Sequence, residues 1–485
     1  MRRLCQHLLV LVLCLSLAGC GPAPRLDRPP GHRPAELVYY TIGYEDKDLK
    51  LVEDALNRLL LERYGFTVSY HKIGWNDYLN QLNGLINTSQ QFDIAFTWGE
   101  HYLQKADNGV FMNLAPYLSS DRGQDLYEAV DPLFWKGVSV GEGIYGVPTN
   151  KELATPMQFL FSRELVEKYN FDLSGPMTLE TLEPMLQVIS RNEPDCIPLF
   201  FDSDPIALME MVGYEYLTAN LSPLVIRTDD PTGTIVNLYE TPEARRMLRL
   251  LHRYYQAGFI NADAALRTGL SRFEDEKVFC RLSSSGPDSS QSFSIDYGYP
   301  IIAVQASPAL ITNASTQGGI MAVNAKTRYP REAQLFLCAV NTDPDVRNLL
   351  NFGLEGIHYR MNEDGQAQLL STDYRGVPYA QGNWFILHTM EGEPADKWEQ
   401  YREFNRNARS SRLLGFEPNF HSCQEVSQSV SRITQQYQAA LMTGSVNPDL
   451  YLPRLNRALE DAGLQDLIDT LQPQVDAWME RNKQP

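Results

Sequence analysis

The chain has 485 residues, 43% of them hydrophobic and 21% charged, which is enough for two or three globular lobes with separate hydrophobic cores. Its formal charge of −18 argues against nucleic acid as a partner, because phosphate binding needs clustered Lys and Arg. The same charge fits a neutral or cationic ligand, or it serves solubility alone.

Residues 1–19 have the pattern of an export signal. Two arginines precede an apolar run, residues 8–17, which is about half of the ~20 residues that a membrane-spanning helix needs. The tetrapeptide Leu17-Ala18-Gly19-Cys20 resembles the lipobox of bacterial lipoproteins. This resemblance implies that Cys20 carries two acyl chains and anchors the protein to the extracellular face of a bacterial cell membrane. The alternative is an ordinary secretory signal followed by a chance cysteine.

The following segment, residues 20–36, is rich in proline and predicts a semi-extended tether. Beyond it, β-branched and aromatic runs predict strands at 37–42, 66–71 and 92–97, and apolar residues at helical spacing predict helices at 48–64 and 77–86. This alternation favours a parallel sheet with crossover helices. Ligands bind at the carboxyl ends of such strands, so the segments after the three strands supply candidate binding residues. These candidates are Tyr44, Glu45, Asp46, Trp75, Trp98 and Glu100.

A short strand at 143–149, punctuated by Gly and Pro, predicts a crossing between two lobes and adds Tyr145 and Asn150 as candidates. Later helices are predicted at 162–169, 179–189, 205–217, 242–257 and 330–339, and later strands at 278–282, 298–304 and 318–323. The tail is predicted to form helices at 427–441, 452–462 and 464–479. Asn383 and Trp384 stand beside glycine in a loop-like context and complete the set of candidates.

The order of these segments resembles the extracellular solute-binding lipoproteins of bacterial ABC importers, in the group that includes maltose-binding proteins. The resemblance rests on residues 92–96, on 143–148 at the first hinge, on the helix end at 254–261 and on the return segment 319–339. The strand at 273–282 departs from the family pattern, with Glu276 where glycine is usual and Cys280 where methionine is usual. Segments 353–359 and 413–416 resemble a Gram-positive subgroup with a distinctive C-terminal region.

This resemblance implies a two-lobed α/β fold of the periplasmic-binding-protein type. Each lobe is expected to be a mainly parallel sheet flanked by helices, and a multi-strand hinge joins the lobes. Lobe 1 is expected at 37–147 and 301–350, lobe 2 at 148–300, and mainly lobe 2 with C-terminal helices at 351–485. The implied function is capture of a solute by hinge closure and its delivery to ABC permease subunits, by a monomer without a cofactor.

The expected ligand is a sugar or oligosaccharide. Sugars stack their C–H faces on aromatic rings and present hydroxyl groups to oriented polar side chains, and 11% of this chain is aromatic. The aromatic candidates are Tyr44, Trp75, Trp98, Tyr145 and Trp384, and the polar ones are Glu45, Asp46, Glu100, Asn150 and Asn383. For each aromatic residue the alternative is packing in a core. A peptide or another polar metabolite is the alternative ligand, and a surface glycosidase or a sensor lipoprotein is the alternative function.

The sequence contains no Gly-x-Ser-x-Gly, His-Glu-x-x-His or P-loop motif. Cys196, Cys280, Cys338 and Cys423 lack the close spacing of a zinc or redox site, and their spacing leaves disulfide pairing open. We therefore expect neither an enzyme nor a metal protein.

Overall fold

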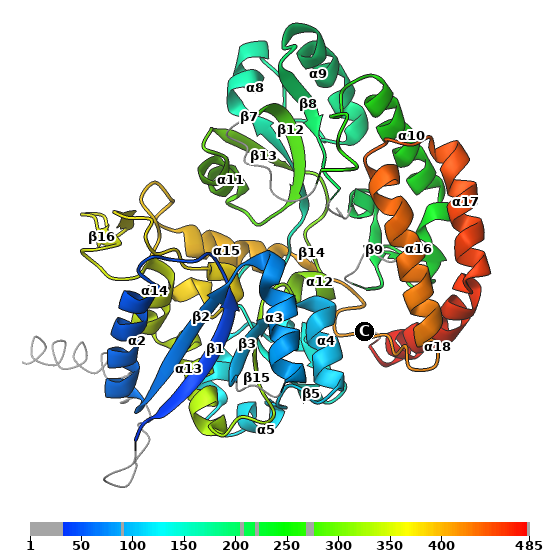
Figure 1. The fold of residues 1–485 in the computed structure, drawn as a ribbon. Helices are drawn as coiled ribbons and strands as arrows, with labels where there is room; N and C mark the ends of the chain where they lie inside the picture. The colour runs from blue at the N-terminus through cyan, green and yellow to red at the C-terminus, as the bar shows by residue number, and fades with distance from the viewer. Residues whose placement is uncertain (1–32, 89–91, 204–207, 219–222, 268–275, 483–485) are drawn as a thin grey trace, which may run out of the picture.

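The computed structural model describes residues 33–88, 92–203, 208–218, 223–267 and 276–482. The predicted signal, Cys20 and most of the tether lie outside these ranges. Two large hydrophobic cores divide the described chain into two lobes (Figure 1). The core of lobe 1 collects residues from 35–154 and 311–380, and the core of lobe 2 collects residues from 157–282 and 413–475.

The sheet of lobe 1 has the strand order β2-β1-β3-β15-β6. β1 pairs in parallel with β2 and β3, whereas β15 is antiparallel to β3 and β6. These strands are β1 (Ala35–Ile42), β2 (Phe66–Ile73), β3 (Ile94–Thr97), β6 (Val147–Pro148) and β15 (Ile320–Val323). Helices around this sheet are α2 (Leu49–Arg63), α3 (Trp75–Asn87), α4 (Gly99–Asp107), α5 (Ala115–Leu118), α6 (Gln124–Ala129), α7 (Pro132–Gly137), α13 (Pro330–Thr342) and α14 (Pro344–Phe352).

The main sheet of lobe 2 has the order β13-β7-β12-β8, and only β12 and β8 pair in parallel. The two-lobed α/β architecture is therefore confirmed, with sheets that are mixed rather than mainly parallel. The strands are β7 (Met157–Ser162), β8 (Cys196–Phe200), β12 (Lys277–Ser284) and β13 (Ile301–Gln305), and a small sheet adds β9 (Tyr214–Tyr216), β10 (Leu224–Arg227) and β11 (Val236–Asn237). The helices are α8 (Arg163–Tyr169), α9 (Leu179–Asn192), α10 (Pro242–Gln256) and α11 (Ser289–Tyr297).

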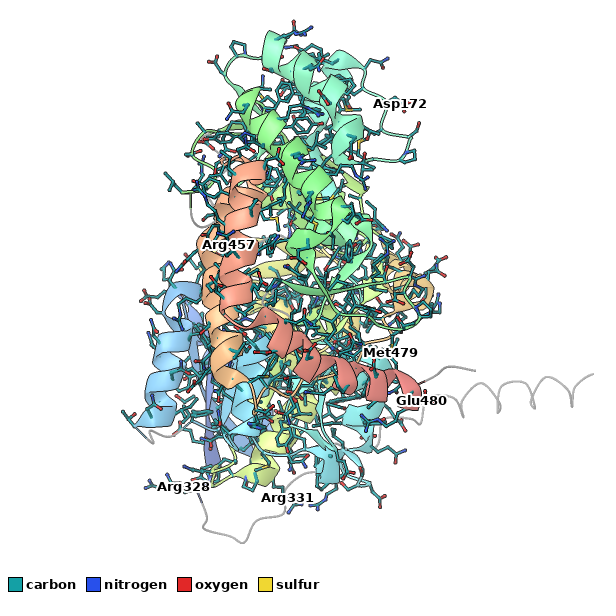
Figure 2. The ribbon with its side chains drawn as sticks, turned by 90° about the vertical axis from the view of Figure 1, so that its right-hand side faces the viewer. Asp172, Arg328, Arg331, Arg457, Met479 and Glu480 are labelled. Carbon is teal, nitrogen blue, oxygen red and sulfur yellow. The ribbon has the colours of Figure 1, made fainter. Side chains whose placement is uncertain are left out.

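Three long helices end the chain: α16 (Gln424–Met442), α17 (Pro448–Asp461) and α18 (Leu464–Arg481). They pack on one another and on α10, so they extend the core of lobe 2. Figure 2 shows this side of the molecule, with Arg457 on α17 and with Met479 and Glu480 on α18, which reaches down toward lobe 1. Among the described residues, no helix combines the length and apolar character that a membrane crossing requires.

The backbone crosses between the lobes at three places, which together form the hinge. The first crossing lies between β6 and β7, the second leads from β13 to β14 (Leu310–Ile311), and the third includes β18 (Arg409–Ser410), which pairs with β14 in parallel. At the third crossing Leu413 packs into the core of lobe 2 and its neighbour Leu414 packs into the core of lobe 1. Two consecutive residues of the third crossing therefore anchor the hinge in the two different cores.

Helix α15 (Lys397–Asn407) lies beside the hinge. It contacts the first crossing and a loop of lobe 2. Asn405 accepts a hydrogen bond from Leu153 N at 2.8 Å and donates one to Lys151 O at 2.9 Å, so α15 is fixed to the first crossing. Lys397 Nζ lies 2.8 Å from Asp288 Oδ2, in the loop that follows β12 of lobe 2. This Asp288–Lys397 ion pair joins α15 to lobe 2.

The lobe boundaries differ from the expected ones in three places. Residues 148–154 stay with lobe 1, because Pro148 pairs with Ile320 in its sheet and Leu153 and Ala154 lie in its core. Residues 301–305 belong to the sheet of lobe 2, where Ile302 pairs with Phe161, so lobe 1 resumes near Leu310 rather than at 301. Residues 351–380 stay with lobe 1, because Val377 and Ala380 lie in its core. A satellite cluster around Phe352 includes the small sheet of β16 (Tyr359–Met361) and β17 (Ala367–Leu369).

The helix predicted at 205–217 is absent from its described part, residues 208–217. A 3-10 turn (Leu208–Val212) ends at Gly213, whose φ is +85°, and β9 follows. Tyr214, Glu215 and Tyr216 pair with β10, so strand pairing outweighs the helical spacing of the apolar residues. Residues 204–207 and the start of the predicted strand at 273–282 lie outside the described ranges.

None of the four cysteines in the described residues forms a disulfide. Cys196, Cys280 and Cys423 are buried thiols and Cys338 is partly buried. Burial raises the pKa of each of these thiols, which keeps them in the neutral form.

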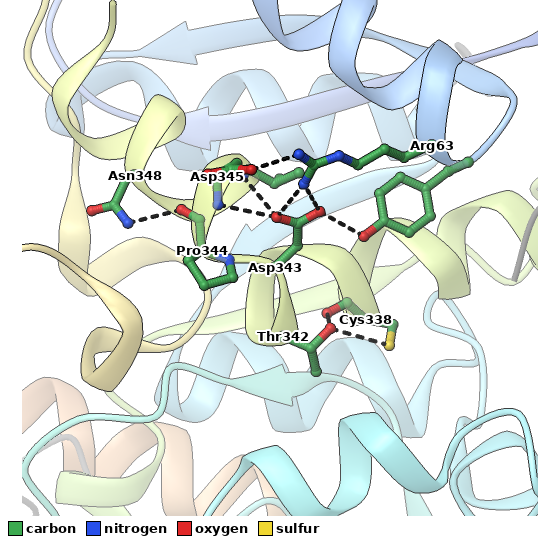
Figure 3. Close-up of polar contacts among 9 residues, drawn as sticks. Arg63, Cys338, Thr342, Asp343, Pro344, Asp345 and Asn348 are labelled. Carbon is green, nitrogen blue, oxygen red and sulfur yellow. Dashed lines mark hydrogen bonds and ion pairs between the residues drawn. The ribbon is translucent and has the colours of Figure 1, made fainter. Parts of the chain in front are cut away.

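Asp343 joins α2 to the α13–α14 corner of lobe 1 (Figure 3). Its carboxylate accepts two hydrogen bonds from Arg63 Nη1, at 2.8 and 2.7 Å, and one from the Tyr64 hydroxyl at 2.8 Å. It also caps α14 by accepting from Asp345 N at 3.0 Å. One buried carboxylate thus orients three structural elements.

We expect Asp343→Ala to destabilise the protein by about 2 to 4 kcal/mol, because it removes a helix cap and leaves Arg63 and Tyr64 without their shared acceptor. The matched control is Asp345→Ala, which removes the other carboxylate bound to Arg63 but one that is 66% exposed. That change should cost less than ~1 kcal/mol. Urea denaturation measures both, and equal losses would contradict the role given to Asp343.

Candidate ligand-binding cleft between the lobes

The carboxyl ends of β1, β2 and β3 meet at one edge of lobe 1. Ile42 pairs with Ile73, and Tyr40 pairs with Ala95, so the segments after these three strands leave the sheet side by side. Figure 1 shows this edge facing lobe 2. The structure therefore brings together Tyr44, Trp75 and Trp98, as the parallel-strand pattern predicts.

An aromatic cluster forms at this edge. The Trp75 ring centroid lies 5.1 Å from that of Trp98, with the ring planes at 76°. On another side, Trp75 Nε1 donates to the Tyr379 hydroxyl at 2.9 Å, and the planes of these two rings differ by only 7°. Trp75 is 49% exposed and Tyr44 is 67% exposed, so neither is a core residue. Burial and the neighbouring Tyr44 raise the pKa of Tyr379.

Asp46 holds the loop after β1 in place. Its side chain and that of Lys72 form an ion pair in which both are almost completely buried. Asp46 also accepts from Arg375 N at 3.1 Å, and Lys72 donates to Arg375 O. Burial lowers the pKa of Lys72. Asp46 is thus engaged inside the protein, while Tyr44 and Glu45 beside it are exposed.

A cavity of about 1730 Å³ opens between lobe 1, the small sheet of lobe 2 and the C-terminal helices. Lobe 1 contributes residues of α4 and the hinge, lobe 2 contributes β9 and the turn before it, and the tail contributes the loop at 416–421 with α16 and α18. Among the residues that line the cavity are Glu100, Tyr145, Gln317, Glu210, Tyr214, Glu215, Tyr216, Phe416, Glu417, Phe420, Gln424, Ser427, Gln428, Ser431, Gln435 and Trp478.

One face of α16 presents neutral polar side chains to the cavity. Gln424, Gln428, Ser431 and Gln435 follow one another at spacings of three and four residues, and Ser427 lies three residues after Gln424, which places them on a single helix face. Amides and hydroxyls both donate and accept hydrogen bonds. Rings of Tyr145, Tyr214, Tyr216, Phe416, Phe420 and Trp478 supply the apolar part of the wall.

Three glutamates of the cavity wall have raised pKa values. Burial raises the pKa of Glu210, Glu215 and Glu417 to about 7, with Glu215 adding to the effect on Glu210 and Asp107 adding to that on Glu417. The Ser411 hydroxyl donates to Glu215 and partly opposes the shift. Below pH 7 these side chains are largely neutral, so they can donate as well as accept hydrogen bonds.

The other sequence candidates take different positions. Glu100 and Tyr145 line the cavity, and Trp98, two residues before Glu100, is half-buried. Asn150 and Asn383 do not line it: Asn150 Nδ2 donates to Asn383 Oδ1 at 3.1 Å and to Ala129 O at 2.9 Å, and both side chains are buried. Trp384 donates to Pro378 O at 2.8 Å and packs near Trp398 and Tyr401.

The sequence interpretation missed Tyr379, the α16 face and the glutamates of lobe 2. For α16 a signal was present, because Gln and Ser recur on one face of a helix whose opposite face is apolar. For Tyr379, Glu210 and Glu215 there was no local signal, since each meets the cleft through contacts with residues far along the chain.

Comparison with known proteins places this geometry in context. The profile of the family described as "Bacterial extracellular solute-binding protein" matches residues 58–353, and a domain of unknown function, DUF3502, matches residues 412–480. The first of these families consists of solute-binding proteins, not of enzymes. A "Carbohydrate ABC transporter substrate-binding protein" of Streptococcus pneumoniae serotype 4 is 28% identical over 98% of this chain and 97% of its own length.

Solved structures show the same architecture. The N-glycan transport solute binding protein (NgtS) of S. pneumoniae has a TM-score of 0.84 at 27% identity, over 93% of this chain and 100% of its own. Its complex with Man5GlcNAc has a TM-score of 0.78 over the same coverage. An "HMO binding ABC-transporter associated Solute Binding Protein" of Bifidobacterium longum infantis, at 13% identity, shares the fold over 92% of this chain and 99% of its own, with a TM-score of 0.60.

We expect Glu215→Gln to flatten the dependence of stability on pH. The native carboxyl group has a pKa of about 7 and an unfolded glutamate one of about 4.5, so the native state holds the proton more tightly. The wild type therefore loses stability as the pH rises from 5 to 8, by up to about 3 kcal/mol from this group, and the variant keeps that stability. Denaturant unfolding at pH 5 and pH 8 measures the difference. The control is Glu425→Gln, the same change at an exposed position of α16, which should leave the pH dependence of stability as it is in the wild type. An unchanged pH dependence for Glu215→Gln would contradict the prediction.

Proposed function

The chain belongs to the bacterial extracellular solute-binding protein family, and from this premise we propose that its solute is a carbohydrate, bound in the cavity between the lobes and delivered to the permease of an ABC transporter. The observation that carries the proposal is the pairing of neutral polar side chains on α16 with aromatic rings around the same cavity. A sugar offers hydroxyl groups to the first and C–H faces to the second. The carbohydrate-binding relatives support the same ligand class.

The raised pKa values of the wall glutamates fit a neutral ligand. A buried carboxylate facing an uncharged sugar would lose its hydration without gaining a counter-charge. A protonated carboxyl group instead donates to a hydroxyl oxygen and accepts from a hydroxyl hydrogen. Glu210, Glu215 and Glu417 can therefore contribute hydrogen bonds without an unpaired charge.

Capture by hinge closure follows from where the cavity residues come from. Glu100 belongs to lobe 1, whereas Gln428 and Gln435 belong to the C-terminal part of lobe 2. A ligand that contacts both sides binds more tightly when the lobes are close, and this differential affinity shifts the population toward the closed arrangement.

We expect Man5GlcNAc to bind the processed chain, residues 20–485 with Cys20→Ala, and Gln435→Ala to weaken binding about tenfold by removing an amide that bonds sugar hydroxyls. Isothermal titration calorimetry measures the affinity. The matched control is Gln436→Ala, the same change one position along α16 at an exposed residue outside the cavity wall. Stabilisation by peptides, with none by any glycan in a thermal-shift screen, would contradict the carbohydrate assignment.

Anchoring through a lipid on Cys20 belongs to the same proposal, because a tethered receptor stays close to its permease. Two acyl chains give stable membrane attachment, and the lipobox-like tetrapeptide before Cys20 supports it. We expect Cys20→Ala to move the full-length protein from the membrane fraction to the medium of a Gram-positive host, measured by immunoblotting of both fractions. Retention of the variant in the membrane fraction would contradict the anchor.

A further inference from the structure

The aromatic cluster at the carboxyl ends of β1, β2 and β3 is partly exposed to solvent. Trp75 lies at the start of α3, at the edge of lobe 1 that faces lobe 2 (Figure 1), and 49% of its side chain is exposed. An exposed tryptophan in a cluster of aromatic side chains marks an interaction site more often than an isolated exposed residue does.

The surroundings of Trp75 fix its ring in one orientation. Phe96 and Trp98 contact it edge to face, with centroid distances of 6.0 and 5.1 Å. The hydrogen bond from Trp75 Nε1 to the Tyr379 hydroxyl holds the two ring planes within 7° of parallel, with centroids 6.3 Å apart. The indole N–H is satisfied inside the protein, so the exposed part of the ring is apolar. We call these two rings the Trp75–Tyr379 platform.

The platform adjoins the cavity without being part of its wall. Trp98, which touches Trp75, is two residues from Glu100 of the cavity wall. Gly99 between them donates its N–H to the carbonyl of Gln317, another wall residue, at 3.0 Å. The platform is therefore joined to the cavity wall through Trp98 and Gly99.

Flat, exposed rings of this kind suit the C–H face of a pyranose, which stacks on an aromatic surface without needing a charge. The cavity volume of about 1730 Å³ already exceeds the roughly 300 to 1,000 Å³ of pockets that hold drug-sized ligands. We infer that the Trp75–Tyr379 platform is an outer subsite that stacks on a sugar ring projecting from the cavity, so that the protein prefers branched or long oligosaccharides over short ones. This inference rests on the proposed function and specifies its substrate class.

The test compares a long glycan and a short glycan, Man5GlcNAc and Man1GlcNAc, by calorimetry on the processed chain with Cys20→Ala. Trp75→Ala should weaken binding of Man5GlcNAc about tenfold and change binding of Man1GlcNAc less than twofold, while Trp75→Phe should restore most of the affinity for Man5GlcNAc. Tyr127→Ala is the control, since Tyr127 is an exposed lobe 1 tyrosine stacked on Trp135 and lies in α6, outside the cluster.

The outcomes separate this inference from the proposed function. If both glycans bind and Trp75→Ala weakens them equally, or weakens neither, the platform is no outer subsite although the carbohydrate assignment stands. If the wild type binds neither glycan and no other carbohydrate, both fail. A far-UV circular dichroism spectrum and melting temperature like those of the wild type assign a loss in Trp75→Ala to binding rather than folding.

Discussion

Two hydrophobic cores can share one cavity only if the backbone that passes between them keeps its polar groups hydrogen-bonded in the gap. In this protein the amides of Asn150 and Asn383 meet that requirement. They bond to each other and to the carbonyl of Ala129, and Asn383 N–H groups also reach Asn341 O. The backbone N–H of Trp384 donates to Asn150 O as well. This buried amide pair therefore holds the start of the first crossing to α6 and α13 of lobe 1.

The crossings also determine which elements can form the binding surface. Because Leu413 and Leu414 pack into opposite cores, the loop at 416–421 and α16 start from a point fixed to lobe 1 although they belong to lobe 2. Gly415 lies against Lys136 O of lobe 1 with a φ of +85°, so a side chain there would be strained. The polar face of α16 is thereby aimed across the gap at α4. The Asp288–Lys397 ion pair adds a charged contact between α15, beside the hinge, and lobe 2. A movement of the lobes must either keep this ion pair or break it.

Much of the architecture could be predicted from local patterns. The β-α-β-α-β run and the helical tail follow from periodicity, and the convergence of Tyr44, Trp75 and Trp98 follows from parallel strands. The crossing expected at 143–149 lies later in the chain, because β6 still belongs to the lobe 1 sheet. Periodicity failed at 208–217, where pairing with β10 decided the outcome. It also could not separate Asn150 and Asn383, which bond inside the hinge, from residues that line the cleft, because the two amides find each other across 233 positions of the chain. Tyr379, Glu210 and Glu215 reach the cleft through tertiary contacts, which no short segment encodes.

The four unpaired cysteines have a consequence for where such a protein can work. Cys196, Cys280 and Cys423 are enclosed in the core of lobe 2, and burial keeps them as thiols. Proteins outside the cell often draw stability from disulfides, and their folding then depends on an oxidant and on the redox state of the surroundings. In the described residues of this chain, packing and hydrogen bonds replace such crosslinks. The two lobes that these residues build should therefore keep the same stability whether their surroundings are oxidising or reducing.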